Sequence, residues 1–267
     1  MDTINHISPS MLGLFCRCQE AFRRRYIEGG SIPPGIAACI GTGMHRGAEV
    51  NHRQKIDTGV DLPVDDIKDA ARDAYREAVS EGVFIPAGEE AEAPKELAKG
   101  ADTAVSLAEV YARHIAPQIT PVAVEEKMAA PVDGLPVPLM GVIDVMDKDG
   151  WCPDLKSAAR KWPIGKELGN MQPPIYRHLL KATHNIPNAT MSFEVISHKG
   201  EYQHITVDVR DEDLAPVIAR AQVLLHAVTS GIYLPAEPGH WLCNPKWCGY
   251  WHTCPYVPAY KKLARSA

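Results

Sequence analysis

The chain has 267 residues, of which 45% are hydrophobic and 23% are charged, and its formal net charge is −5. This length and apolar fraction suffice for a substantial core, which excludes a disordered protein. No apolar run approaches the roughly 20 residues of a membrane span, and the first residues lack a secretory signal, so we expect a cytoplasmic protein with no membrane partner. The negative charge excludes a global attraction to nucleic acid and leaves room only for a local basic patch.

The first part of the chain is predicted to be helical. Residues 8–10, Ser-Pro-Ser, provide a cap and a first-turn proline for a helix that continues through the cysteines and arginines that follow. The glycine-rich stretch 41–47 is expected to open a second helix, which would carry His45 near its start. Residues 65–80 and 91–116 combine good helix formers with apolar residues at helical spacing, so each predicts one further helix.

From residue 122 onward the pattern becomes that of β-strands with intervening helices. Strands are predicted at 122–130, 137–147, 151–158, 190–197 and 202–209. The "KDG" between the second and third strands is good turn material, so these two are expected to pair as a hairpin. Helices are predicted at 173–183 and 211–230. The sequence therefore predicts a mixed α/β fold with a core sheet flanked by helices.

Three charged residues stand out within the predicted hairpin. Strands disfavour Asp and Lys, so Asp144, Asp154 and Lys156 either face solvent or belong to a site. In a hairpin the two aspartates can face each other, and Lys156 shares a face with Asp154 because side chains alternate along a strand. A solvated salt-bridge cluster is the alternative. The apolar flanks, among them Val142 and Leu155, favour a mostly buried strand pair and hence a site.

The seven cysteines, an odd number in a chain expected to be cytoplasmic, argue against a disulfide framework. Three of them, Cys243, Cys248 and Cys254, fall within twelve residues, and Cys16 and Cys18 lie near the start. Four thiolates suit either a 4Fe–4S cluster or a tetrahedral zinc ion, whereas three buried thiols would be the purely structural alternative. Metal or cluster ligation is favoured, with Cys16 and Cys18 competing for the fourth position.

Five motifs, taken in order, resemble those of one nuclease family. Asp144 followed by the Pro-Asp-Leu-Lys of residues 153–156 resembles the core motif of the PD-(D/E)xK nuclease superfamily. The resemblance implies a restriction-endonuclease-like core with a helical insertion. The four motifs similar to those of its RecB-type branch are a Ser-Pro-Ser helix leading to Cys18, His45, the Gln-x-x-x-Tyr of Gln172 and Tyr176, and the three C-terminal cysteines.

This resemblance implies a DNA exonuclease that uses Mg²⁺ or Mn²⁺. Hard cations prefer oxygen ligands, an imidazole favours Mn²⁺, and a bound cation activates both phosphate and water. Glu125 and Glu126, on the preceding strand, are expected to be solvated, with Glu126 at most in a supporting role. The implied metal ligands are His45, Asp144, Asp154 and the backbone carbonyl of Leu155, and the implied catalytic residues are Asp144, Asp154, Lys156, Gln172 and Tyr176.

The resemblance also implies a structural 4Fe–4S cluster held by Cys18, Cys243, Cys248 and Cys254, with zinc as the alternative. Ligation would join the two ends of the chain and restrict the unfolded state. We therefore expect one nuclease domain over residues 1–267. Its parts would be an iron–sulfur subdomain from 1–40 and 231–267, a helical region at 41–120 and a catalytic core at 121–230.

The expected partner is DNA, contacted without base readout and at single-stranded ends. Arg23, Arg24, Arg160 and Lys161 are candidate phosphate contacts. Two alternatives stay open: a non-cleaving nucleic-acid-binding or assembly protein on the same scaffold, and a zinc-stabilised endonuclease acting on structured DNA. The family resemblance implies recombination, replication or CRISPR-type proteins as partners, and it allows a homo-oligomer.

Overall fold

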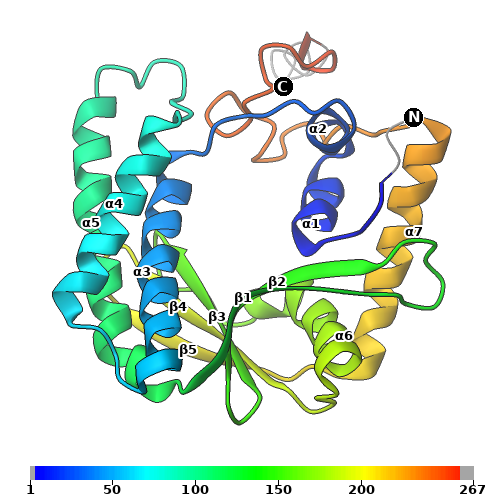
Figure 1. Ribbon diagram of the computed structural model, residues 1–267. Coiled ribbons are helices and arrows are strands. Elements are labelled where there is room, and N and C mark those ends of the chain that lie inside the picture. Colours follow the sequence, from blue (N-terminus) through cyan, green and yellow to red (C-terminus); the bar gives the residue numbers. More distant parts are fainter. Residues whose placement is uncertain (1–3, 259–267) are drawn as a thin grey trace.

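The computed structural model describes residues 4–258 and places helices on both sides of a central group of strands (Figure 1). Residues 1–3 and 259–267 of the predicted iron–sulfur subdomain lie outside the described residues. No helix in the described part of the chain is long and apolar enough to cross a membrane. The α-helices are α1 (Pro9–Arg17), α2 (Gln19–Phe22), α3 (Ile36–Thr58), α4 (Val64–Ser80), α5 (Ala93–His114), α6 (Gln172–His184) and α7 (Ala215–Ser230).

The strands form two small sheets. The first pairs β1 (Pro121–Ala130) with β2 (Leu139–Asp147) in antiparallel register. In the second, β3 (Trp151–Ala158) runs parallel to β4 (Thr190–Ser197), and β4 pairs antiparallel with β5 (Tyr202–Val207). The helix α6 connects β3 to β4, as a parallel pair requires. The predicted strands and the mixed α/β class are confirmed.

The predicted pairing of β2 with β3 is wrong. The turn at residues 147–150 is present, but β3 pairs along its whole length with β4, while β2 pairs with β1. At the start of β2, Leu139 also forms an isolated parallel bridge with Ile7. The two sheets are linked instead by the carboxylate of Asp144, whose Oδ2 accepts the N–H of Leu155 at 2.9 Å. Asp144 therefore lies where the two sheets part.

The predicted first helix is divided into two at Cys18. This residue has an extended backbone, with φ −163° and ψ 105°, and its N–H still closes α1 by donating to the carbonyl of Leu14. Its Sγ then accepts the N–H of Ala21 at 3.4 Å, so the thiol caps α2. A π-helical turn, Arg23–Ile27, follows α2. The break turns the Cys18 side chain away from the face that an unbroken helix would give it.

His45 lies near the middle of α3, and the prediction that it stands at a helix start is wrong. The helix begins at Ile36, well before the glycine-rich stretch. These glycines allow close packing instead: a Cβ atom on Gly43 would lie 2.6 Å from the carbonyl oxygen of Ala71 on α4. Glycine normally weakens a helix interior and is common at helix boundaries. For this reason the sequence placed the start of α3 at the glycine-rich stretch, too late in the chain.

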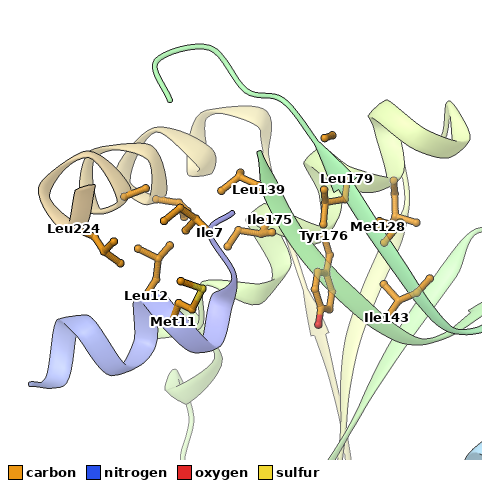
Figure 2. Packing of buried hydrophobic residues seen from close by; sticks show 14 of the residues in the cluster. Ile7, Met11, Leu12, Met128, Leu139, Ile143, Ile175, Tyr176, Leu179 and Leu224 are labelled. Atoms are coloured by element: carbon orange, nitrogen blue, oxygen red, sulfur yellow. The ribbon is translucent and has the colours of Figure 1, made fainter. Parts of the chain in front are cut away.

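The buried apolar residues form two cores, one in each half of the molecule. In the first, shown in Figure 2, α1, α6 and α7 pack on β1 and β2 through residues such as Leu12, Leu139 and Leu179. In the second, α3, α4 and α5 pack on one another through Ile67 and Leu107 and reach the strands. Between these cores the strands bring together side chains from both halves of the chain.

Candidate active site

Three ligand-type side chains converge where the two sheets part. Nδ1 of His45, on α3, lies 3.5 Å from Oδ2 of Asp144, on β2. Glu125, on β1, falls opposite Asp144 in the register of the β1–β2 pair. One ligand atom from each of the three lies within 4.8 Å of the others, and all three side chains are half-buried. An imidazole and two carboxylates at that spacing suit one divalent cation.

Glu125 reaches this group through a left-handed backbone. Its φ is 49°, a conformation that costs a non-glycine residue about 1–3 kcal/mol and that is concentrated at functional sites. Burial, and then the charge of Asp144, raises the pKa of Glu125 to about 7. A bound cation would oppose that effect by favouring the carboxylate. The expectation that Glu125 is merely solvated is therefore wrong, and no sequence signal marks a left-handed residue within a strand.

Asp154, on β3, is buried, with 7% of its surface exposed. Its Oδ1 accepts a hydrogen bond from Nε2 of Gln172 at 3.1 Å, and the Lys156 ammonium lies 2.6 Å from Oδ2. The ammonium and Oδ2 form a close ion pair, and Oδ2 has no other hydrogen-bond partner among the described residues. Burial, and then the charge of Asp144, raises the pKa of Asp154 to about 6. A cation that bound this oxygen would share the carboxylate with Lys156.

Gln172 and Tyr176 lie one turn apart on α6 and extend this network. Gln172 is the first residue of α6, with two prolines in its first turn, as predicted. Its Nε2 also donates to Oη of Tyr176 at 3.1 Å, and Tyr176 donates to the carbonyl of Val142 at 2.6 Å. The ring can approach β2 because residue 141 is Gly141, where a Cβ atom would lie 2.6 Å from it. Gln172 thus holds Asp154, and Tyr176 holds Gln172.

The structure brings all the predicted catalytic side chains into one network. It links His45 to Asp144, and it links Asp154 to Lys156 and Gln172. Leu155 takes part through its N–H, which donates to Asp144, and the role of its carbonyl as a metal ligand stays a prediction. The main difference from expectation is that Glu125 joins His45 and Asp144 in the tightest group of ligand atoms.

Four of the seven cysteines line a second site, at the two ends of the chain. Burial, and then the neighbouring thiols, raises the pKa of Cys243 to about 11. Cys16 lies elsewhere: it is exposed and interacts with Arg220 on α7. The thiols that share one small hollow are those of Cys18, Cys243, Cys248 and Cys254.

These four thiols, which we call the thiol site, fit a metal group. The neighbouring thiols raise the pKa of Cys243 and of Cys248, because thiolates in one hollow repel each other. A bound cation would offset that repulsion and stabilise the thiolate forms. In the described part of the chain no three of their sulfurs lie within 4.8 Å of one another. Four thiolates could hold either a tetrahedral zinc ion or an iron–sulfur cluster.

Two of the predicted phosphate contacts, Arg23 and Arg24, form ion pairs with a buried carboxylate of the protein itself. Glu20 is 3% exposed and accepts hydrogen bonds from both guanidinium groups, at 2.8 Å and 2.7 Å. Hydrogen bonding to Arg23 holds the pKa of Glu20 below its ordinary value. Arg24 also donates to the side chain and the carbonyl of Thr253. These contacts join α2 to the C-terminal segment beside the thiol site.

The other two predicted phosphate contacts, Arg160 and Lys161, follow β3 at exposed positions. The Nζ atom of Lys161 lies 3.7 Å from a carboxylate oxygen of Glu201. Neither residue is among those that line the two open hollows beside the active site. Their role in binding DNA stays a prediction.

Comparisons with known proteins concern the family and the fold of the chain. The sequence model of the PD-(D/E)XK nuclease superfamily matches residues 6–255. No curated protein sequence matches the chain significantly. The solved structure of a candidate exonuclease from Eubacterium rectale is similar in fold, with a TM-score of 0.55, 10% identity, and coverage of 93% of this chain and 88% of that one. A structure of the protein SSO0001 covers 96% and 88% at 13% identity, with a TM-score of 0.43.

Proposed function

The chain belongs to the PD-(D/E)XK nuclease superfamily, and from that premise we propose that it is a metal-dependent DNA exonuclease of the RecB type. The proposal includes action at single-stranded ends and a structural 4Fe–4S cluster. The observation that carries it is the meeting of His45, Glu125 and Asp144 with the Asp154–Lys156 pair where the two sheets part. A scaffold that only bound DNA would have no need of this arrangement.

The metal would be held by His45, Glu125 and Asp144, with the carboxylate of Asp154, which pairs with Lys156, as a further ligand. When bound, Mg²⁺ or Mn²⁺ would polarise a phosphoryl oxygen and lower the pKa of a water. The imidazole ligand favours Mn²⁺ over Mg²⁺. Because Asp144 also accepts the N–H of Leu155, one of its oxygens is fixed before any cation binds. Such fixed ligands reduce the reorganisation that metal binding requires.

Lys156 would supply the positive charge that the reacting phosphate needs. Its ammonium is held 2.6 Å from Asp154 and its side chain is 26% exposed, so it can reach a phosphate without leaving the network. There it would orient the attacking water and stabilise charge in the transition state. Gln172 keeps Asp154 in place, and Tyr176 in turn keeps Gln172 in place.

The thiol site would serve stability rather than chemistry. It ties Cys18 to Cys243, Cys248 and Cys254, and so would close nearly the whole chain into one loop. The sequence spacing of the cysteines, which lacks the paired Cys-x-x-Cys of common zinc modules, favours an iron–sulfur cluster over zinc. Iron and acid-labile sulfide should therefore accompany the anaerobically purified protein in equal amounts, whereas stoichiometric zinc would favour the zinc-stabilised alternative.

Digestion of end-labelled single-stranded and double-stranded DNA with Mn²⁺ tests the activity. We expect the purified protein to release label from single strands, a chelator to stop it, and Lys156→Ala to abolish it. Lys148→Ala, in the exposed turn between β2 and β3, is the matched control and should retain the activity. If folded, cluster-replete protein cuts no DNA, the non-cleaving binding or assembly role takes its place.

A further inference from the structure

Two open hollows flank the active site and carry opposite charge. The first, of about 670 Å³, lies along α3 and α4 and is lined at its inner end by Asp144 and Glu125. We call it the acidic hollow, because its lining also includes Glu49, Glu77 and Glu81. Apart from His45, the only basic residue in that lining is Arg46, which is paired with Glu49 at 2.7 Å.

The second hollow, of about 790 Å³, lies between α1, β2 and the segment that leads into α6. We call it the basic hollow, since its lining includes Arg17, Lys156 and Lys166 and no Asp or Glu. Gln172 and Tyr176 line its inner end. No residue lines both hollows. In Figure 1, α3 and α4 stand at the left and α1 and α6 at the right. Asp144 and Glu125 line the acidic hollow and Lys156 lines the basic hollow, so the catalytic residues are divided between the two.

Two aromatic rings hold the lysines of the basic hollow in place. The Nζ atom of Lys166 lies 4.7 Å from the centre of the Trp162 ring, and that ring packs against Phe193 at 5.2 Å. On the other side, the Nζ atom of Lys156 lies 5.9 Å from the centre of the Phe193 ring. Cation–π contacts favour these positions. Trp162 and Phe193 thus link the catalytic lysine to a second, exposed ammonium in the same hollow.

We infer that one DNA strand lies in the basic hollow, held by Lys166 and Arg17, and that its end lies at the catalytic residues. This inference rests on the proposed function and adds where the substrate strand and its end lie. The acidic hollow disfavours the phosphates of a strand that continues past the site, because carboxylates repel them. A cation at the active site would offset Glu125 and Asp144, but Glu77 and Glu81 lie further along α4 at exposed positions.

The segment between β3 and α6 also favours unpaired DNA over a duplex. Ile164 and Leu168 lie on the segment that carries Trp162 and Lys166, and they are 106% and 83% exposed. Exposed apolar side chains of this size are stabilised by contact with base faces, which an unpaired strand presents and a duplex buries. The segment 162–168 therefore offers the ammonium of Lys166 to the phosphates inside the hollow, and the apolar side chains of Ile164 and Leu168, which lie outside the lining of the hollow, to the bases.

Binding and cleavage test this inference separately. In a chelator, where no cleavage occurs, Lys166→Ala should weaken binding of a fluorescent single-stranded oligonucleotide about fivefold to tenfold and reduce the salt slope by about one. Trp162→Ala should weaken binding to a similar extent because it releases Lys166. Lys148→Ala should bind as the wild type does. Unchanged binding by Lys166→Ala would overturn the inference whether or not the protein cuts DNA.

Circular single-stranded DNA tests the effect of the acidic hollow. With Mn²⁺ we expect linear strands to be degraded and circles to survive at least tenfold longer. The double variant Glu77→Lys/Glu81→Lys should open circles and lengthen the products from linear DNA. Equal cutting of circles and linear strands by the wild type would overturn the inference and leave the proposed nuclease activity intact. Absence of any cutting would instead contradict the proposed function, and the binding assay would still test the basic hollow.

Discussion

The active site and the thiol site are built in different ways. The active-site side chains stand on helices and strands, and Asp144, Asp154 and Gln172 are bonded to neighbours before any metal binds. Three of the four thiols of the thiol site stand on residues 231–256, which form no helix or strand. Contacts with other parts of the chain hold that segment, among them Arg24 to Thr253 and Tyr250 to the carbonyl of Gly30. The first site is ordered by regular elements, whereas we expect a bound group to add to the order of the second.

This difference predicts opposite consequences of mutation. A residue of the active site can be changed without loss of stability, because the surrounding elements hold themselves in place through the two cores. A residue of the thiol site can be changed without loss of chemistry, provided that the protein is kept below its new melting temperature. Three predictions separate the two regions, and a fourth concerns the helical half that carries His45.

The largest effect is expected from Asp144→Asn. The amide keeps an acceptor for the N–H of Leu155 but removes a charged metal ligand, so cleavage should fall about a thousandfold, or about 4 kcal/mol. Tm should stay within about 3 °C of the wild-type value. Single-turnover cleavage and thermal melting measure both quantities, with Asp149→Asn in the exposed turn as the control. A large drop in Tm would mean that Asp144 is structural.

Cys248→Ser should have the reverse effect. We expect Tm to fall by about 10 °C and iron content to fall with it, because the chain ends are no longer joined. Cleavage at 20 °C should stay within about threefold of the wild type. Cys16→Ser is the matched control, since this thiol is exposed and lies outside the thiol site. Loss of iron at unchanged Tm would refute the structural role.

The helical half should lose stability in acid through His52. This buried imidazole contacts Oη of Tyr111 at 2.8 Å, and burial lowers its pKa from 6.5 to about 4. The unfolded chain binds the proton first, so the contribution of His52 is complete above pH 6.5 and is lost as the pH falls to about 4. It amounts to about 3 kcal/mol.

Urea unfolding of the wild type and His52→Gln between pH 7 and pH 4 measures this contribution. The variant cannot take up that proton, so its stability should fall less steeply with decreasing pH. Its absolute stability does not enter the comparison, since only the slope is read. Equal slopes of unfolding free energy against pH for the two proteins would show that protonation of His52 does not lower the stability of this core.

The smallest effect is expected from Glu125→Gln. The loss of one of the two carboxylates in the His45–Glu125–Asp144 group should weaken Mn²⁺ binding about tenfold, or about 1.4 kcal/mol, in calorimetric titration. Glu126→Gln is a close control, because the neighbouring carboxylate pairs with His184 at 2.9 Å instead of joining the site. Equal Mn²⁺ affinities in the two variants would remove Glu125 from the metal site.

The sequence predicts elements better than the relations between them. The apolar periodicity of α4 and α5 and the alternation in β4 and β5 are local, and they are confirmed within a few residues. The pairing of β2 with β3 is not local, and in the structure β2 pairs with β1 and β3 pairs with β4 instead. A turn sequence indicates a reversal of the chain, but it does not determine which strands pair.

Backbone exceptions also escape prediction. Cys18 breaks a helix that its neighbours would continue, and Glu125 takes a left-handed φ within a strand. Both residues lie at candidate sites, where local preferences are overridden by the surrounding structure. Asp144 and Lys156 could be identified from the sequence, because charged residues are unusual in an apolar strand.

Anomalous diffraction from crystals soaked in Mn²⁺ tests the central claim most directly. We predict one strong peak at bonding distance, about 2.0–2.3 Å, from ligand atoms of His45, Glu125 and Asp144, and no peak at this position in Asp144→Asn. A peak elsewhere, or the same peak in the variant, would contradict the assignment of the chemistry to the place where the two sheets part.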